Sequence, residues 1–520
     1  MQLGDLISEL GIRVARGGAS GVRVSDMTED SRTVVPGSLF VARAGRKSDG
    51  RRFAHDAVRA GACAILTDSG ADVESFPLGA VLLVCEDVPL ATALLAERLH
   101  GNPSRSLLLV GVTGTNGKST VTQLVHQLLN RCGVRCGMIG TVEVDDGREV
   151  APSPMTTPPS IELSRTLATM VETGCRAAVM EVSSHALDQK RADGLSFDAA
   201  VFTNLSGDHL DYHGSVEAYV AAKRRLFTLL DAGVGGPAIL NADDPVAGST
   251  PAARPVRCGM VDPGACDWFV RRSEPSVEGE WLDLAWAGGR IGARVPLVGG
   301  HNAMNALQAT AAAWTVLERA GMEPERARRS LEQALTLVRP PRGRLEAVHE
   351  EGDDIAVFVD YAHTDDALAR SLAAVGSVKP TGSRLWVVFG CGGERDRTKR
   401  PRMGLAAVRG ADRVVVTSDN PRSESPARII ADVMDGVPRE KRDSVTVHID
   451  RDRAILSAIE SASPGDVVVI AGKGHETEQV LPDGAGGTVS RWFVDQEFAA
   501  LGLAERRARA MKASGTGLVV

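Results

Sequence analysis

The sequence predicts an α/β protein with three domains, and three observations lead to this prediction. Short apolar runs of strand length alternate with helix-periodic stretches along most of the chain, an alternation that is typical of parallel sheets covered by helices. The length of 520 residues is sufficient for about three domains with a core each. The segment LLLVGVTGTNGKST at 107–120 has the pattern of a strand, a glycine-bearing turn and the start of a helix.

The first predicted domain, residues 1–104, is an α/β domain. Strand-like runs SLFVA, CAILT and VLLVC alternate with Ala-rich helical patterns in this part of the chain. The segment HGNPS at 100–104 combines Gly, Asn and Pro, which are typical of a break between elements, and it marks the end of the domain.

The second predicted domain, residues 105–338, is a parallel sheet with helices on both faces. Its apolar strands are expected at 107–112, 176–182, 199–203 and 237–240, with helix-periodic stretches between them. Residues 251–300 lose the helical period, and this predicts an antiparallel insertion.

The third predicted domain, residues 339–520, is a doubly wound, Rossmann-like α/β domain. It begins after the stiff hinge sequence VRPPRG at 338–343. Strands at 355–359, 384–390, 413–417 and 466–470 alternate with helices.

The composition excludes several classes of function. The 59 basic and 66 acidic residues give a net charge of −7, so no general attraction to nucleic acid or anionic membranes is expected. No apolar run reaches the roughly 18–20 residues of a membrane span, and the first residues, MQLGDLISEL, do not resemble a signal peptide. The eight scattered cysteines form no zinc set and are expected to be free thiols. We therefore expect a cytoplasmic protein.

The segment 107–120 carries the strongest chemical signal. The apolar residues that follow it share one helical face up to Gly133, so a helix is expected to start after the glycine turn. Backbone N–H groups of such a loop can bind phosphate, the Lys118 ammonium can reach the outer phosphates, and the Ser119 hydroxyl can bind magnesium. The strict Walker pattern is not met, because Val112 stands where its first glycine is expected. A glycine-rich turn with a surface lysine is the simpler alternative. We predict an ATP site made of Gly114, Thr115, Asn116, Gly117, Lys118, Ser119 and Thr120.

Polar residues follow two further strands of this predicted sheet. Glu181 and Ser183 end one strand, and Asp208 and His209 follow another. Since ligands bind outside the carboxyl ends of parallel strands, these residues are expected to converge on the phosphate loop. Oxygen ligands favour Mg²⁺, although the two histidines in DHLDYH leave zinc as an alternative. Polar caps on strand–helix turns would explain one such segment, but explain several convergent segments poorly.

Eight motifs together resemble the Mur ligases. In chain order they are TGTNGKST, EVSSHALDQKR, FTNLSGDHLDYHG, YVAAKRRLF, DYAHT, GCGGERDRTKRP, SDNPRSE and AGKGHE. The resemblance extends from about residue 25 to about residue 497. It implies an ATP-dependent amide ligase of peptidoglycan precursor synthesis, with an N-terminal UDP-binding domain, a central ATP-binding domain and a C-terminal amino-acid-binding domain.

The resemblance also implies a reaction with an acyl phosphate. The D-glutamate γ-carboxylate of UDP-N-acetylmuramoyl-L-alanyl-D-glutamate would attack the γ-phosphate of ATP, and the amine of meso-diaminopimelate would then displace phosphate. The family match implies that Lys118 is catalytic, that Ser119 and Glu181 bind one Mg²⁺ and that His209 binds a second. Lys223 matches a carbamylated, magnesium-binding lysine of the family, whereas the sequence alone favours a solvated surface charge.

Further binding residues are also implied by the match. Asn305, Arg344 and Asp360 correspond to the adenine, phosphate and ribose contacts of ATP. Ser31 is the expected uridine contact. The residues that match positions for the muramoyl dipeptide are Thr156, Thr157, Ser183, Gln189 and Arg191.

The predicted amino-acid pocket consists of Arg395, Asp419, Asn420, Pro421, Arg422, Gly472 and Glu476. Two arginines for carboxylates and one acid for an ammonium complement diaminopimelate, and lysine lacks the second carboxylate. The chain departs from the family pattern at Asp365, Glu394 and His301.

Several alternatives remain open at this point. Sister ligases add lysine, LL-diaminopimelate or D-Ala-D-Ala, and folylpolyglutamate synthetase shares the middle domain. A different class is a non-catalytic nucleotide-binding scaffold, and an ATPase switch acting on proteins is another. A monomer is the default expectation for the oligomeric state.

Overall fold

The computed structural model of the chain describes residues 1–45, 49–207, 209–230 and 235–513. The α/β fold class predicted from the sequence is confirmed. Two compact units are formed: the first comprises Met1–Val270, Leu284–Ile291 and Met304–Ala334, and the second comprises Arg271–Asp283, Gly292–Ala303 and the described residues from Leu335 onward. The predicted domain limits at 104 and 338 stay predictions.

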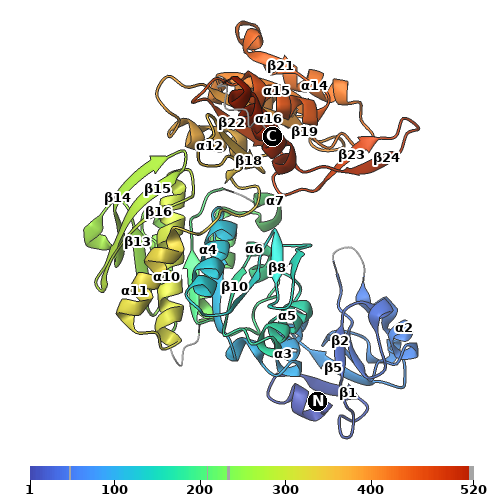
Figure 1. Cartoon of the computed structure of the whole chain (residues 1–520). Helices are drawn as coiled ribbons and strands as arrows, with labels where there is room; N and C mark the ends of the chain where they lie inside the picture. Colours follow the sequence, from blue (N-terminus) through green and yellow to red (C-terminus); the bar gives the residue numbers. More distant parts are fainter. Residues whose placement is uncertain (46–48, 208, 231–234, 514–520) are drawn as a thin grey trace, which may run out of the picture. The chain divides into compact units, whose positions relative to one another are not determined.

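The first unit begins with a small five-stranded sheet, and Figure 1 shows it near the N-terminus. Its elements are α1 (Leu3–Ile7), β1 (Arg13–Arg16), β2 (Asp26–Thr28), β3 (Ser38–Val41), α2 (Ala54–Arg59), β4 (Ala64–Asp68), β5 (Val81–Cys85) and α3 (Val88–Leu99). The strand order is β1-β5-β4-β3-β2, with β1 antiparallel and the other pairings parallel. Alternate residues of β3 and β4 enter two separate cores, one under α1 and α3 and one under α2. Strands β3, β4 and β5 confirm the three predicted strands.

A larger sheet of eleven strands follows. Its elements are β6 (Leu108–Thr113), α4 (Lys118–Arg131), β7 (Cys136–Ile139), β8 (Glu143–Asp145), β9 (Val150–Pro152), α5 (Ser160–Glu172), β10 (Ala177–Glu181), α6 (Ser184–Asp188), β11 (Ala199–Phe202), α7 (Leu210–His213), α8 (Val216–Thr228), β12 (Ala238–Asn241), α9 (Pro245–Gly248), β13 (Pro255–Gly259), β14 (Trp268–Ser276), β15 (Gly279–Trp286), β16 (Gly289–Val295), α10 (His301–Arg319) and α11 (Pro324–Leu335). The strand order is β16-β15-β14-β13-β12-β11-β6-β10-β7-β8-β9.

The centre of this sheet is parallel and has helices on both faces, as predicted. Strands β12, β11, β6, β10 and β7 pair in parallel. Helices α5, α6 and α8 pack on one face, whereas α4 contacts β6, β7 and β10 on the other. The apolar stripe of α4 is fully buried from Val121 to Leu129, which confirms the helix predicted after the glycine turn.

The predicted antiparallel insertion at 251–300 is wrong for its first strand. Strand β13 pairs in parallel with β12 and with β14. The short helix α9 returns the chain to the start of the sheet before β13, so this strand continues the parallel pattern.

The second unit contains a six-stranded sheet and a separate hairpin. The elements are β17 (Glu346–Ala347), β18 (Ala356–Asp360), α12 (Asp365–Gly376), β19 (Leu385–Cys391), α13 (Lys399–Gly410), β20 (Arg413–Ser418), α14 (Pro426–Met434), β21 (Val445–Val447), α15 (Arg451–Ser461), β22 (Val467–Ala471), β23 (Glu478–Pro482), β24 (Thr488–Trp492) and α16 (Asp495–Ala513). The sheet order is β17-β18-β22-β19-β20-β21, with only the β17–β18 pairing antiparallel.

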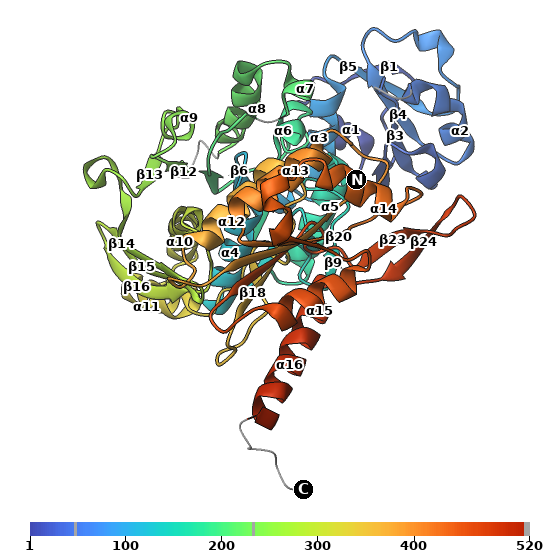
Figure 2. The same ribbon diagram turned by 90° about the horizontal axis from the view of Figure 1, so that it is seen from above.

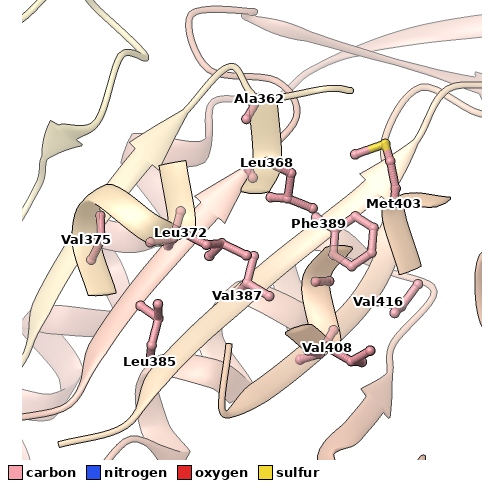
Figure 3. Packing of buried hydrophobic residues seen from close by; sticks show 14 of the residues in the cluster. Ala362, Leu368, Leu372, Val375, Leu385, Val387, Phe389, Met403, Val408 and Val416 are labelled. Carbon is pink, nitrogen blue, oxygen red and sulfur yellow. The ribbon is translucent and has the colours of Figure 1, made fainter. Parts of the chain in front are cut away.

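Alternate side chains of these strands enter opposite cores. Val387 and Phe389 pack with Leu372 under α12 and α13 (Figure 3), whereas Trp386 and Val388 face α15 and α16. Figure 2 shows α12 and α13 on one side of this sheet and α15 and α16 on the other. The predicted doubly wound architecture is therefore present, with β18, β19, β20 and β22 at the predicted places.

All eight cysteines are free, as predicted; Cys63 and Cys266 are partly exposed and the other six are buried. Within the described part of the chain, no helix is long and apolar enough to cross a membrane.

Candidate functional site

The first candidate site lies at the carboxyl edge of the central sheet. Thr113 at the end of β6 is in register with Phe202 of β11, and Val112 is in register with Glu181 of β10. The residues that follow these strands therefore start from one edge, as the sequence predicted. Asp208, which was expected at this edge, lies outside the described residues.

The phosphate loop depends on two glycines. Gly114 has φ +146° and Gly117 has φ +83°, in a region that side chains other than glycine rarely adopt. A Cβ atom on Gly114 would lie 1.9 Å from Thr203 Oγ1, and one on Gly117 would lie 2.5 Å from Asn305 Oδ1. The structure thus places the predicted adenine contact Asn305 directly against the loop.

Side chains that follow β11 hold the loop in shape. The backbone N–H of Asn116 donates to Asn204 Oδ1 (3.0 Å), and its carbonyl accepts from Thr203 Oγ1 (2.5 Å) and Asn204 Nδ2 (3.1 Å). The Thr115 hydroxyl lies 3.0 Å from the hydroxyl of Tyr219. Protein groups from the segment after β11 and from α8 therefore support the loop conformation.

Two lysines donate to backbone oxygens of this loop. Lys118 Nζ donates to the carbonyls of Gly114 and Thr115, both at 3.0 Å. Lys223 Nζ donates to Gly114 O at 2.7 Å and lies 4.5 Å from the centre of the Tyr219 ring. The Lys223 residue is only 1% exposed, so the prediction of a solvated surface lysine is wrong.

Glu181 is a buried carboxylate with neutral donors. Its two oxygens accept from the backbone N–H (2.8 Å) and the hydroxyl (3.0 Å) of Thr141. That hydroxyl also lies 3.0 Å from the hydroxyl of Thr156. Sequence reasoning missed Thr141 because it missed the preceding strand β7, which has only four residues, one of them glycine.

His209 belongs to a cluster of aromatic rings. It is the N-cap residue of α7 and has φ +53°, and its ring centre lies 4.9 Å from that of His185 and 6.3 Å from that of Tyr219. His213 joins the cluster and lies 3.0 Å from the Ser184 hydroxyl. Burial lowers the pKa of His185 and of His213, which favours neutral imidazoles that can act as ligands.

The donor set is chemically suited to magnesium. Among the described residues, no lysine or arginine pairs with the buried Glu181 carboxylate, so a cation beside it would compensate its charge. Ser119 is half buried in the first turn of α4. No ready-made cluster of three or more His, Cys, Asp or Glu side chains occurs in the described parts of the chain, so remaining ligands would have to be water or substrate oxygens.

The residues predicted to hold the muramoyl dipeptide form one network. The Thr157 hydroxyl donates to Glu181 O (3.0 Å) and accepts from Ser183 N–H (3.1 Å). Arg191 donates to Thr157 O (2.7 Å) and to Gln189 Oε1 (2.8 Å). Gln189 and Arg191 also line a small cavity with Glu29, Arg43, Pro89, Thr92, Pro159 and Ser160.

Lys190, between these two residues, forms an ion pair with Asp87 at the start of α3. The predicted uridine contact Ser31 begins a short 3₁₀ turn, Ser31–Thr33, and is not among the cavity-lining residues.

In the second unit, Asp360 has a clear structural function. Its carboxylate accepts from Leu345 N–H (2.8 Å), Ala362 N–H (3.0 Å) and Ser371 Oγ (2.8 Å). The Arg344 guanidinium lies 5.2 Å from the ring centre of Tyr361, which follows Asp360. These bonds fix the start of the loop that follows β18. The nucleotide contacts predicted for Arg344 and Asp360 stay predictions.

The loop after β20 carries the predicted amino-acid pocket. Arg422 has φ +53°, and its Nη1 donates to Gly393 O (2.7 Å) and Asn420 O (3.4 Å). A Cβ atom on Gly393 would lie 1.9 Å from Pro421 O, so only glycine permits this approach of the two loops. A Cβ atom on Gly392 would lie 3.2 Å from Arg422 Nη1 and 3.7 Å from Arg395 Cγ, so both predicted arginines flank this glycine.

The loop after β22 contacts the same residues from the other side. Asn420 Nδ2 donates to Glu476 Oε2 at 2.8 Å. A Cβ atom on Gly472 would lie 2.7 Å from Asp419 Oδ2. The structure therefore joins the two motifs that the sequence assigned to one pocket.

Lys473 is a member of this pocket that sequence reasoning missed. Its ammonium is fully buried and donates to Asn420 Oδ1 (3.2 Å), Glu476 Oε2 (3.0 Å) and Glu478 O (2.5 Å). The sequence does carry a signal for this residue, because Lys473 stands between two glycines directly after the buried strand β22.

The departures from the family pattern have structural partners. Asp365 starts α12, where a negative charge is favourable, and lies 3.3 Å from Arg402. Glu394 adopts φ +54°, and its N–H donates to Glu424 (2.5 Å). His301 is the first residue of α10, and its ring lies where a Cβ on Gly299 would be.

Comparisons with known proteins identify the family of the chain. Three family models match the chain: "Mur ligase family, catalytic domain" over residues 23–98, "Mur ligase middle domain" over 112–313 and "Mur ligase, glutamate ligase domain" over 343–474. The UDP-N-acetylmuramoyl-L-alanyl-D-glutamate–2,6-diaminopimelate ligase of Chlorobaculum tepidum is 42% identical over 494 residues, covering 92% of this chain and 94% of the relative. The ligase of the same name from Synechococcus elongatus is 42% identical over 499 residues, covering 94% and 96%.

A solved structure of a ligase with that name superposes with a TM-score of 0.73 at 31% identity and covers 98% of this chain and 99% of its own. The fold, the phosphate loop and these matches define an ATP-dependent ligase that forms amide bonds. The chain belongs to the Mur ligase family. The folylpolyglutamate synthase of Mycobacterium tuberculosis, with a TM-score of 0.55 at 20% identity, shares the fold alone.

Proposed function

We propose that this enzyme joins meso-diaminopimelate to the D-glutamate γ-carboxylate of UDP-N-acetylmuramoyl-L-alanyl-D-glutamate at the expense of ATP. Relatives at 42% identity over more than nine-tenths of the chain carry the name of that ligase. Domains at 1–104, 105–338 and 339–520 would bind the UDP part, ATP and the amino acid in turn. Because the reaction consumes ATP, we expect it to occur in the cytoplasm, with the enzyme acting as a monomer.

The observation that carries the proposal is the charge pattern around Asn420. Its carbonyl accepts from the Arg422 guanidinium (3.4 Å), and its side-chain amide donates to the Glu476 carboxylate (2.8 Å). A cation and an anion fixed on one residue complement the distal ammonium and carboxylate of diaminopimelate. Lysine lacks that carboxylate and would leave the Arg422 charge without a partner, so it is expected to bind less well.

The chemistry would proceed in two steps. The γ-carboxylate oxygen attacks the γ-phosphorus of ATP, which releases ADP and leaves an acyl phosphate. The amine of diaminopimelate then attacks the acyl carbon, and the tetrahedral intermediate expels phosphate as the amide forms. Both steps require positioning of reactants and neutralisation of oxyanions rather than covalent catalysis by the enzyme.

The phosphate loop supplies this neutralisation. Loop N–H groups and the Lys118 ammonium would bind the phosphates of ATP, with Lys118 exchanging its bonds to the Gly114 and Thr115 carbonyls for the γ-phosphate. Asn305 is placed against Gly117 to contact the nucleotide. Magnesium, held by Ser119 and Glu181 with a second ion at His209, would act as a Lewis acid towards the phosphoryl oxygens.

Lys223 would enter this site as a carbamate. Carbamylation leaves one N–H on Nζ, which can keep the 2.7 Å bond to Gly114 O. The added carboxylate would change a buried cation into an anion that can bind Mg²⁺. Intact-protein mass measurement tests this modification, and an unmodified mass in bicarbonate buffer would contradict it.

The first experiment is phosphate release by the purified enzyme with ATP, Mg²⁺ and UDP-N-acetylmuramoyl-L-alanyl-D-glutamate. Three amino acids are compared: meso-diaminopimelate, LL-diaminopimelate and L-lysine. Turnover with meso-diaminopimelate alone supports the proposal. Turnover with lysine would support the ligase reaction but contradict the function given to Arg422. No phosphate release with any of the three amino acids would favour a non-catalytic scaffold.

A further inference from the structure

We propose that Lys473 is a positioning residue that sets the orientation of Asn420 and Glu476 for the amino-acid substrate. The inference rests on the proposed function, because it assigns this pocket to diaminopimelate. Lys473 lies in the loop between β22 and β23, and its side chain has no exposed surface. Burial of an ammonium is costly unless acceptors surround it, so this lysine needs a structural or functional reason.

The bonds of Lys473 exclude direct contact with the substrate. An ammonium has three hydrogens to donate, and three acceptors lie around Nζ: Asn420 Oδ1 at 3.2 Å, Glu476 Oε2 at 3.0 Å and Glu478 O at 2.5 Å. No hydrogen is left for a ligand. Lys473 can therefore affect the substrate only through the groups that it holds.

The first of these groups is the Asn420 amide. Its Oδ1 accepts from Lys473 Nζ and from Val480 N–H (3.0 Å), and both partners are donors only. This arrangement fixes which end of the amide is the oxygen, and it turns Nδ2 towards Glu476 at 2.8 Å. Without the ammonium, only one backbone donor would keep the amide from turning over.

The second group is the Glu476 carboxylate, whose side chain is 34% exposed. Both Lys473 Nζ and Asn420 Nδ2 donate to the same oxygen, Oε2. Within the described residues, Oε1 accepts no hydrogen bond. Glu476 is thus held by one oxygen and presents the other, and Oε1 is the acceptor that we assign to the distal ammonium of diaminopimelate.

The test is steady-state kinetics of Lys473→Met, with meso-diaminopimelate, ATP and the UDP-linked substrate varied in turn. Because a hydrogen bond to a charged group typically contributes enough for about a 10- to 100-fold change in affinity, we expect KM for diaminopimelate to rise by about that factor. KM for the other two substrates is expected to be unchanged. Lys441→Met, the same substitution at an exposed position of the same unit, serves as the control and should leave all three KM values unchanged.

A double-mutant cycle separates positioning from a general loss of structure. If Lys473 acts through Glu476, Lys473→Met combined with Glu476→Gln should raise KM for diaminopimelate no further than Glu476→Gln alone. Strict additivity in the cycle would overturn the proposal. An unchanged KM for diaminopimelate in folded Lys473→Met would overturn it as well.

Lys473→Gln provides a second variant if the methionine variant does not fold, because glutamine retains donors in a neutral side chain. It should also raise KM for diaminopimelate selectively. If neither variant folds, or if all three KM values rise together, Lys473 is a structural residue and the proposal fails. A wild-type enzyme that is inactive with diaminopimelate would instead overturn the proposed function, and this inference with it.

Discussion

The phosphate loop and the proposed amino-acid pocket hold their charged groups in different ways. Around the phosphate loop, Lys118 and Lys223 donate to backbone carbonyls, and Glu181 accepts from an uncharged threonine. In the amino-acid pocket, Lys473 pairs with Glu476, and both bind the same asparagine. These bonds of the first site join charged groups to backbone and neutral partners, whereas those of the second join side-chain charges to one another.

This difference separates general chemistry from substrate choice. Every nucleoside triphosphate presents the same three phosphates, so backbone N–H groups of a loop and a helix start can bind them. An amino-acid substrate is distinguished by the placement of its charges, which only charged side chains can match. The four predictions that follow test this contrast, beginning with the largest expected effect.

The buried ion pair behind the amino-acid pocket tests whether charge pairing holds the second unit together. Arg451 and Asp495 are both fully buried, with Nη2–Oδ2 at 2.7 Å, and Arg451 also donates to Ala471 O at the end of β22. Asp495→Asn leaves a buried cation uncompensated and is expected to lower the free energy of unfolding by about 3–5 kcal/mol. Denaturant unfolding measures this loss. Glu497→Gln, an exposed change on the same helix, is the control and should have little effect on stability. Equal losses of stability in the two variants would contradict the importance of the buried charge pair.

Lys118→Met tests the phosphate loop. The ammonium donates to two neutral loop carbonyls, which can be solvated when it is lost, so the rate should fall far more than the stability. Loss of one charge-stabilising donor is expected to lower kcat by about 10²–10³-fold. Phosphate release measures the rate. Arg131→Met at the other end of the same helix is the control. A loss of stability in place of a loss of rate would contradict this description of the loop.

Arg422→Asn tests substrate choice. Arg422 has φ +53°, a conformation that asparagine tolerates, so the change removes the guanidinium without added backbone strain. KM for meso-diaminopimelate is expected to rise by about 10- to 100-fold while KM for ATP stays constant. Arg428→Ala, an exposed arginine in the following helix, is the matched control. An unchanged KM would remove Arg422 from the pocket.

The smallest effect is expected at a partly exposed pair in the first unit. The hydrogen bond from His126 (3.0 Å) lowers the pKa of Asp145 below its ordinary value of 3.8. A lowered folded-state pKa contributes stability that is present above 3.8 and is lost as the pH falls through the folded value. Asp145→Asn should therefore flatten the fall of unfolding free energy below about pH 4 and cost less than about 1 kcal/mol at pH 7. An unchanged acid slope would contradict this pairing.

Much of the fold was predictable because it depends on local patterns. The buried strands β6, β10, β18 and β22 are continuous apolar runs, and the α4 stripe has a clear helical period. Strand β7 and the hairpin β23–β24 were missed. Strand β7 is apolar but has only four residues, one of them glycine. Strand β24 is exposed along its whole length and has no apolar face to detect.

The site was predictable only where a motif and its spacing carried the signal. The phosphate loop meets that condition. The pairing of Lys473 with Asn420 does not, because it joins residues from two loops that are distant in sequence and become neighbours only when β20 and β22 enter one sheet. Thr141 was missed together with strand β7, which it follows, and its bond to Glu181 likewise joins residues at the ends of two different strands.

The distribution of thiols gives this enzyme a built-in chemical asymmetry. Only Cys63 and Cys266 are partly exposed, and both lie in the first unit. In the second unit, Cys391 is buried, and burial raises its pKa to about 12, so it is inert towards alkylating reagents. A maleimide dye should therefore label the first unit alone. With those two positions changed to serine, one cysteine introduced on the surface of each unit would make a fluorescence ruler for movement between them as substrates bind.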